Sequence, residues 1–308
     1  MPIKGVGINA DSYRIKGDLE LLEADLAFFE EVGFDYVEIP IHGVDGIIGG
    51  ELNLKSIKKV KEALRKHHLK ATVHCPDPLN LREGDFELNQ KVFKSCIEFT
   101  SELEAEILVY HAGNFKTSKQ TSQHQDLARR KEIEALESLS DFAAERGVQI
   151  CVENVAGSLE ELVRMVGEVD RENVGITCDF GHAFLFYSAC GRKGGFLESI
   201  EKARPYLKHL HIHDNFGRLT SGFALDSLTT PYIDRLPFGE GDLHMPPGMG
   251  KIPYNKIISL IKGYRGVVIM EIDPRYKDFY QEALTSIKKN LRKSQNGPKN
   301  EKKYRSKK

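Results

Sequence analysis

The stretch that decides the fold reads GVQICVENVAG, residues 147–157. Gly147 is typical of a helix end, because glycine readily adopts the left-handed conformation that stops a helix. The run Val148–Glu153 is short, apolar and β-branched, which indicates a strand buried on both faces. That run ends on a carboxylate, Glu153, and a loop follows. The stretch therefore predicts a helix end, a buried strand and a charged residue at the carboxyl end of that strand.

Seven other runs share these features: Ile3–Asn9, Tyr36–Pro40, Lys70–Cys75, Ile107–His111, Val174–Asp179, Leu207–His213 and Val267–Ile272. Between the runs lie segments with an apolar stripe at helical spacing: Asp18–Val32, Leu54–His67, Phe86–Leu103, Gln125–Arg146, Leu159–Val166 and Tyr254–Ile261. Strands and helices that alternate in this way form parallel βαβ units, and eight such strands close a barrel. We expect an α/β fold with a single (β/α)8 TIM barrel.

The connections that follow the strands are the longer ones, and they are predicted to be loops: Ile41–Glu51, Pro76–Gly84, Ala112–Ser122, Phe180–Gly195 and Asn215–Gly250. A barrel builds its active site from the loops at the carboxyl ends of its strands. The last of these segments, after the seventh strand, is rich in proline and glycine. It is predicted to be a lid or site loop and not a further helix.

Charge divides the chain into two parts. Residues 288–308 contain ten Lys and Arg and one acid, Glu301; without them, the totals of 44 basic and 45 acidic residues become 34 and 44, a net charge of about −10. A segment so basic and so poor in apolar residues cannot bury a core. We therefore expect a barrel domain over 1–287 and a disordered basic tail over 288–308. A solubilising role for the tail is favoured over contact with nucleic acid.

The cysteines and the hydropathy indicate where the protein resides. Five cysteines show no CxxC pair and no regular spacing, so neither a disulfide framework nor a thiolate zinc site is predicted. No signal segment is recognised at the start, and no apolar run approaches the roughly 18 residues of a membrane span. We expect a cytoplasmic protein without a membrane partner.

Nine side chains that bind divalent metals lie at or just after strand ends: His74, His111, Glu153, Asp179, His182, His211, Asp242, His244 and Glu271. A barrel brings its strand ends to one rim, where these side chains would form one pocket. Taken singly, a histidine such as His74 is more often a hydrogen-bonded polar residue than a metal ligand. Glu153 and Glu271 are stronger evidence, because each ends an apolar strand where an unpaired carboxylate is costly. The set predicts one to three divalent ions per chain.

Spacing adds to this prediction. Asp179 and His182 form D-x-x-H, and Asp242 and His244 form D-x-H, so each pair can face one pocket.

Alternation along the seventh strand puts His209, His211 and His213 on one face. The deepest, His209, is predicted to lie in the core. We favour His211 as the metal ligand, with His213 as the alternative.

Four motifs resemble a known family: ENVAGS from Glu153, CDFGHAF from Cys178, HIHDN from His211 and DLHMPPGMG from Asp242. In order and strand placement they are similar to the xylose-isomerase-like TIM barrel superfamily, which joins sugar and sugar-phosphate isomerases and epimerases with the endonuclease IV phosphodiesterases. The resemblance extends from the second strand to the eighth.

The resemblance implies an enzyme with a divalent ion (Mn, Mg, Co or Zn) held by four residues: Glu153, Asp179, His211 and Glu271. In the isomerase and epimerase branch it implies that Glu153 and Glu271 transfer protons on a small sugar or sugar phosphate, through an enediolate that the ion stabilises. His182 would bind the substrate, and His74 and His111 would line it. Some epimerases carry a substrate-binding arginine where this chain has Gly217, so the adjacent Arg218 is the candidate.

The other branch implies a different activity. Endonuclease IV holds three zinc ions, and the chain offers residues for all of them: His74, His111 and Glu153; Asp179, His211 and Glu271; His182, Asp242 and His244. Such a cluster suits phosphodiester hydrolysis at abasic sites in DNA. A net charge of about −10 before the tail opposes DNA binding, which relies on Lys and Arg contacts to phosphate. We therefore favour a metal-dependent sugar isomerase or epimerase, with a zinc phosphodiesterase as the alternative.

Overall fold

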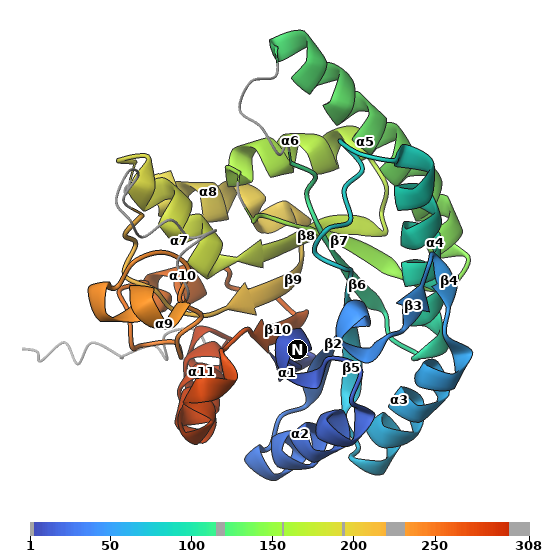
Figure 1. Ribbon diagram of the computed structural model, residues 1–308. Coiled ribbons are helices and arrows are strands. Elements are labelled where there is room, and N and C mark those ends of the chain that lie inside the picture. Colours follow the sequence, from blue (N-terminus) through green and yellow to red (C-terminus); the bar gives the residue numbers. More distant parts are fainter. Residues whose placement is uncertain (1–2, 115–120, 156, 193–194, 220–231, 296–308) are drawn as a thin grey trace, which may run out of the picture.

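The computed structural model describes residues 3–114, 121–155, 157–192, 195–219 and 232–295. At its centre eight parallel strands close a barrel in the order β1-β10-β9-β8-β7-β6-β5-β2. These strands are β1 Gly5–Asn9, β2 Tyr36–Pro40, β5 Lys70–His74, β6 Ile107–His111, β7 Gln149–Glu153, β8 Val174–Asp179, β9 Leu207–Ile212 and β10 Val267–Met270. All eight fall within the predicted runs, and helices surround the barrel (Figure 1). The predicted TIM barrel is confirmed.

The helices of the described residues are α1 Ser12–Ile15, α2 Leu19–Val32, α3 Leu54–Lys66, α4 Phe86–Glu102, α5 Ser122–Ala144, α6 Leu159–Val169, α7 Phe180–Ala189, α8 Gly195–Ala203, α9 Tyr232–Arg235, α10 Tyr254–Leu260 and α11 Tyr280–Gln295. Short 3-10 turns are η1 Ile41–Val44, η2 Arg204–Tyr206, η3 Leu236–Phe238 and η4 Pro274–Phe279, and a small hairpin joins β3 Ile47–Ile48 to β4 Glu51–Leu52. No helix in the described part of the chain has the length and apolar character of a membrane span.

Side-chain caps fix where several helices begin. The carboxylates of Asp18 and Asp85 accept backbone N–H groups in the first turns of α2 and α4, and the Ser158 hydroxyl does the same for α6. Gly33 ends α2 with a φ of 91°, in the left-handed region that glycine readily adopts. Because the helices start just after the loops at the carboxyl ends of the strands, these caps also fix the geometry of that rim.

The prediction of a loop over Phe180–Gly195 is wrong, because most of that segment is α7. Phe180, Ala183 and Tyr187 are buried, while Phe184 and Phe186 also pack against the core. Apolar residues on all sides give α7 no single stripe, so helical periodicity could not reveal it.

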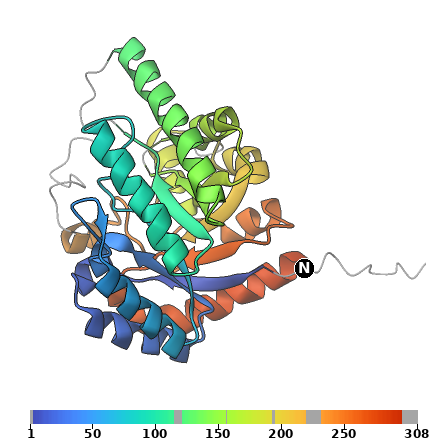
Figure 2. The ribbon, with the colours of Figure 1, turned by 90° about the vertical axis from the view of Figure 1, so that its right-hand side faces the viewer.

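The predicted tail begins too early. Helix α11 continues past Ile287 to Gln295, and Leu291 is buried in the core. The Lys288 ammonium lies 3.0 Å from Asp35. At its start α11 lies beside α2 (Figure 2). The ring of Tyr280 contacts Phe28 and Phe29 there. The barrel domain therefore includes residues beyond 287, and the rest of the predicted tail, 296–308, lies outside the described residues.

The long segment between β9 and α10 is anchored by Asp214. The backbone of Asp214 pairs with that of Met245 at 2.7 and 3.1 Å, and its carboxylate accepts the N–H groups of Gly248 and Ile252 at 2.8 and 3.1 Å. The segment also contains α9 and η3, so it is less irregular than predicted; residues 220–231 lie outside the described residues. The anchor holds the DLHMPPGMG stretch over the barrel.

A buried ion pair ties two further rim segments together. Glu132 on α5 is fully buried and bonds to the guanidinium of Arg82. The Tyr110 hydroxyl and the Gly113 N–H also donate to Glu132, at 2.9 and 2.7 Å. One carboxylate thus joins the segment after β5 to the segment after β6.

We predict that Glu132→Gln lowers the free energy of unfolding by about 3–5 kcal/mol, because it removes the buried carboxylate beside Arg82 and leaves that largely buried charge with only the more distant Glu161, at 3.8 Å. Urea denaturation measures this loss. Glu168→Gln is the matched control, since Glu168 pairs with Arg129 at 2.8 Å at the surface, and it should cost at most about 1 kcal/mol. Equal losses in the two variants would contradict the importance of the Glu132 network.

Candidate metal and active site

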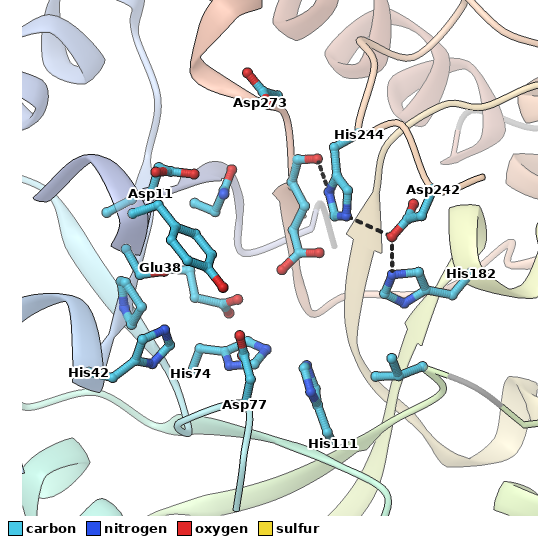
Figure 3. Close-up of a pocket in the computed structure, with 17 residues that line it drawn as sticks. Asp11, Glu38, His42, His74, Asp77, His111, His182, Asp242, His244 and Asp273 are labelled. Carbon is cyan, nitrogen blue, oxygen red and sulfur yellow. Dashed lines mark hydrogen bonds and ion pairs between the residues drawn. The ribbon is translucent and has the colours of Figure 1, made fainter. Parts of the chain in front are cut away.

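A pocket of about 370 Å³ opens at the carboxyl ends of the strands. Six of the nine predicted ligand residues line it: His74, His111, His182, Asp242, His244 and Glu271 (Figure 3). The other three, Glu153, Asp179 and His211, are fully buried. The structure therefore brings all nine residues to one end of the barrel.

The four residues predicted as the core metal site lie together. Glu153, Asp179, His211 and Glu271 offer ligand atoms that all lie within 4.8 Å of one another. His211 Nδ1 is 3.3 Å from Glu153 Oε1 and 3.2 Å from Glu271 Oε1. Neighbouring strands set this arrangement, because Asp179 on β8 lies in register with His211 on β9.

Several atoms of this group are buried without a hydrogen-bond partner among the described residues: both carboxylate oxygens of Glu153, Oδ2 of Asp179 and Nδ1 of His211. Buried polar atoms without partners are costly, and buried carboxylates need a cation. Three carboxylates and one imidazole form a donor set that suits Mg²⁺, Mn²⁺, Co²⁺ or Zn²⁺. The residues present thus fit the predicted divalent ion.

The two glutamates of the group differ in acidity. Burial acts to raise the pKa of Glu153, but the positive charge of His211 and the close imidazoles of His111 and His182 outweigh it and hold that pKa well below its usual range. Burial raises the pKa of Glu271, and the negative charge of Glu153 adds to the rise. Glu271 is therefore the readier of the two to carry a proton.

Two more histidines flank Glu153. The Nε2 atoms of His74 and His111 each lie 3.4 Å from Glu153 Oε2. His74 Nδ1 lies 2.7 Å from the carbonyl of Cys75, which leaves Nε2 facing the site. Burial acts to lower the pKa of His74, yet Glu153 and Glu38 raise it to about 10. Asp77, which the sequence analysis did not select, joins His74 and His111 in a possible ligand group.

The remaining predicted residues gather around Asp242. Its Oδ2 atom lies 3.0 Å from His182 Nε2 and 2.9 Å from His244 Nε2. His213 belongs to this group as well, with Nδ1 3.6 Å from Asp242 Oδ1 and Nε2 3.1 Å from Asp179 Oδ1. His211 and His213 were treated as alternatives, whereas the structure places His211 in the core group and His213 in this second group.

Glycine at position 181 permits that arrangement. A Cβ on Gly181 would lie 2.0 Å from the His213 ring, so any other residue would displace the imidazole. This explains the glycine of the CDFGHAF motif in physical terms.

Glu38, in the middle of β2, is the main site residue that was not predicted from the sequence. It is buried, and its Oε1 atom lies 3.0 Å from His211 Nε2. Its Oε2 atom lies 3.1 Å from His209 Nε2 and accepts the Thr72 hydroxyl at 2.8 Å. A carboxylate behind a ligating histidine fixes its tautomer and ring orientation. Glu38 therefore holds His211 with Nδ1 facing the other three core residues, and His209 lies fully buried as predicted.

Arg218 does not line the described pocket. Its guanidinium donates to the carbonyl of Phe238 at 3.0 Å. Besides Glu38, three carboxylates not selected from the sequence line the pocket: Asp11, Asp77 and Asp273 (Figure 3).

Comparison with known proteins agrees with the fold. The family described as xylose isomerase-like TIM barrel matches residues 26–294. An uncharacterized protein of Methanocaldococcus jannaschii is 26% identical over 267 residues, which cover 82% of this chain and 79% of that protein. The inosose isomerase of Halalkalibacterium halodurans is 25% identical over 297 residues, which cover 87% of this chain and 89% of that protein.

Solved structures show the same barrel. A D-tagatose 3-epimerase-like protein superposes with a TM-score of 0.71 at 22% identity and covers 94% of this chain and 98% of its own. The IOLI protein with a bound zinc atom gives a TM-score of 0.64 at 23% identity, and the match covers 93% of this chain and 96% of that protein. At these identities the structural likeness supports the fold alone.

We predict that Glu38→Gln weakens Mn²⁺ binding by about 10- to 100-fold, because an amide no longer fixes the His211 ring as a carboxylate does. Isothermal titration of metal-free protein measures the affinity. Thr72→Val is the control, since it removes a contact to Glu38 that does not involve His211, and it should cause a smaller loss. Unchanged affinity in Glu38→Gln would contradict the positioning role. If the Glu38→Gln variant bound one ion fewer per chain, Glu38 would itself be a metal ligand.

Proposed function

Because the chain belongs to the xylose isomerase-like TIM barrel family, we propose that it is a divalent-metal-dependent isomerase or epimerase of a small polyhydroxylated sugar. One observation carries the proposal: Glu153 and Glu271, the two carboxylates suited to proton transfer, share one buried donor group with Asp179 and His211. A sequence relative named inosose isomerase and a structural neighbour named as epimerase-like support the same class.

The four core residues would hold the ion, and the bound ion would polarise a substrate carbonyl so that a proton leaves the adjacent carbon more easily. A site of three carboxylates and one imidazole is compatible with Mn²⁺, Mg²⁺, Co²⁺ or Zn²⁺.

Glu271 is placed to exchange a proton with substrate. Its side chain is 12% exposed and lines the pocket, whereas that of Glu153 is only 1% exposed and lies beneath a group of imidazoles. In an epimerisation one carboxylate removes the proton from the carbon and keeps it, and a second carboxyl group, protonated beforehand, delivers another proton from the opposite face. In this scheme Glu271 and Glu153 are the two groups. His182, which lines the pocket and is oriented by Asp242, binds a substrate oxygen.

The pocket favours an unphosphorylated substrate. Asp11, Asp77 and Asp273 line it, and in the described part of the chain no Lys or Arg does. Asp11 and Asp273 each use one oxygen to accept a backbone N–H, at 2.6 and 2.9 Å. Burial raises the pKa of Asp11, and the charge of Asp273 adds to the rise. A phosphate would meet like charge there, whereas sugar hydroxyls can donate to these carboxylates.

The second candidate is a zinc phosphodiesterase. The group of His182, His213, Asp242 and His244, together with the group of His74, Asp77 and His111, offers sites for additional cations. Clustered zinc ions suit phosphodiester hydrolysis. The acidic lining of the pocket is unfavourable for a nucleic-acid substrate.

We predict that Glu153→Gln and Glu271→Gln each slow exchange of the substrate α-proton with deuterated solvent by about 10²- to 10⁴-fold. Nuclear magnetic resonance on an inosose and on D-fructose with metal-saturated protein measures the exchange, and elemental analysis verifies that each variant holds metal. Glu62→Gln on the surface of α3, where the side chain is 63% exposed, is the control and should exchange like the unchanged protein. Full exchange by both site variants would sink the two-carboxylate mechanism.

Metal content separates the two candidate functions. The isomerase proposal predicts about one or two ions per chain in protein purified without chelator. Three tightly held zinc ions together with cleavage of an abasic-site duplex would instead establish the phosphodiesterase.

A further inference from the structure

A second concave region lies at the opposite end of the barrel. A pocket of about 470 Å³ is bordered by Lys4 just before β1, Ile107 at the start of β6, Gln149 at the start of β7 and Gly266 just before β10. Since the strands are parallel, this end is the one remote from Glu153 and the predicted metal site.

Five cationic side chains line this pocket: Lys4, Arg204, Lys208, Lys262 and Arg265. No carboxylate lines it in the described part of the chain. The chain before residue 288 has a net charge of about −10, so this concentration of positive charge runs against the overall balance.

Most of these charges have no counter-ion. Lys4 pairs with Glu106. Among the described residues, the other four form no ion pair. The neighbouring pocket is different, because its Lys61 and Arg65 both contact Glu104, at 3.1 and 2.8 Å.

Helix ends explain only some of the cationic side chains around this pocket. Arg204 follows α8 and Lys262 follows α10, where a cation interacts favourably with the carbonyl end of the helix dipole. Lys208 lies on β9 and Arg265 in the turn before β10, where no helix end explains them. Like charges around one concavity repel each other, and a bound anion would relieve that repulsion.

We propose that this pocket binds a small anion with two or more phosphoryl groups, such as the diphosphate of a nucleotide. Four uncompensated cations match the charge of a diphosphate better than that of a single carboxylate. The volume lies within the range of small-molecule pockets, about 300–1,000 Å³. The cations surround a hollow and do not follow an extended stripe, which distinguishes this site from a nucleic-acid surface. The site is independent of the proposed isomerase activity.

Calorimetric titration of the full-length protein with sodium pyrophosphate at low ionic strength tests the proposal. The double variant Lys208→Gln/Arg265→Gln should bind pyrophosphate at least about tenfold more weakly. Lys61→Gln/Arg65→Gln removes the same net charge from ion-paired cations next to the pocket, and it should bind within about twofold of the unchanged protein. The basic segment after residue 288 is common to all three proteins.

A second double variant, Arg204→Gln/Lys262→Gln, alters exposed side chains and should show the same loss even if the first folds poorly. The proposal fails if pyrophosphate does not bind, or if all double variants lose affinity equally, which would indicate attraction to net charge. It also fails if a single-stranded oligonucleotide binds more tightly than pyrophosphate and if the same variants lose that binding.

Discussion

The structure depends on how negative charge is accommodated at the carboxyl end of the barrel. Glu38, Glu153 and Asp179 are buried there, and Glu271 stands beside them. Carboxylates removed from water destabilise a fold unless positive charge and hydrogen bonds surround them. His211 supplies part of this positive charge, because one ring nitrogen lies 3.0 Å from Glu38 and the other lies 3.3 Å from Glu153. The unpaired oxygens that remain are the ones that the proposed divalent cation would bind.

Rigid elements hold this group in place. The side chain of Asn154 bonds to both the backbone N–H and the carbonyl of Asp179, each at 2.9 Å. Asp179 in turn accepts the N–H of His182 at 2.6 Å and so begins α7. One residue thus serves as candidate ligand, strand end and helix cap. A site built on strand ends and helix starts is held more precisely than one built on loops, which suits a reaction that needs a proton donor at a defined position.

Much of the fold and the core of the site could be predicted from the sequence, because both depend on local pattern. The strand at Val148–Glu153 is apolar and ends on a charge, and parallel pairing then brings Glu153 beside Asp179 and His211. Helix α7 escaped prediction because it is apolar on every side. Glu38 was overlooked because it lies inside its strand, YVEIP, whereas Glu153 ends an apolar run. Which carboxylate faces His211 depends on register across β2, β1, β10 and β9.

The roles of His211 and His213 show where sequence reasoning ends. Alternation puts both on one face of β9, but only three-dimensional placement assigns one to Glu153 and the other to Asp242. Anomalous diffraction from crystals of the Mn²⁺-loaded protein shows which residues bind the ion. We expect a peak bonded to Glu153, Asp179, Glu271 and the Nδ1 atom of His211, and this assignment is the basis of the proposed function. A peak bonded only to residues around Asp242, with the Glu153 carboxylate uncoordinated, would contradict it.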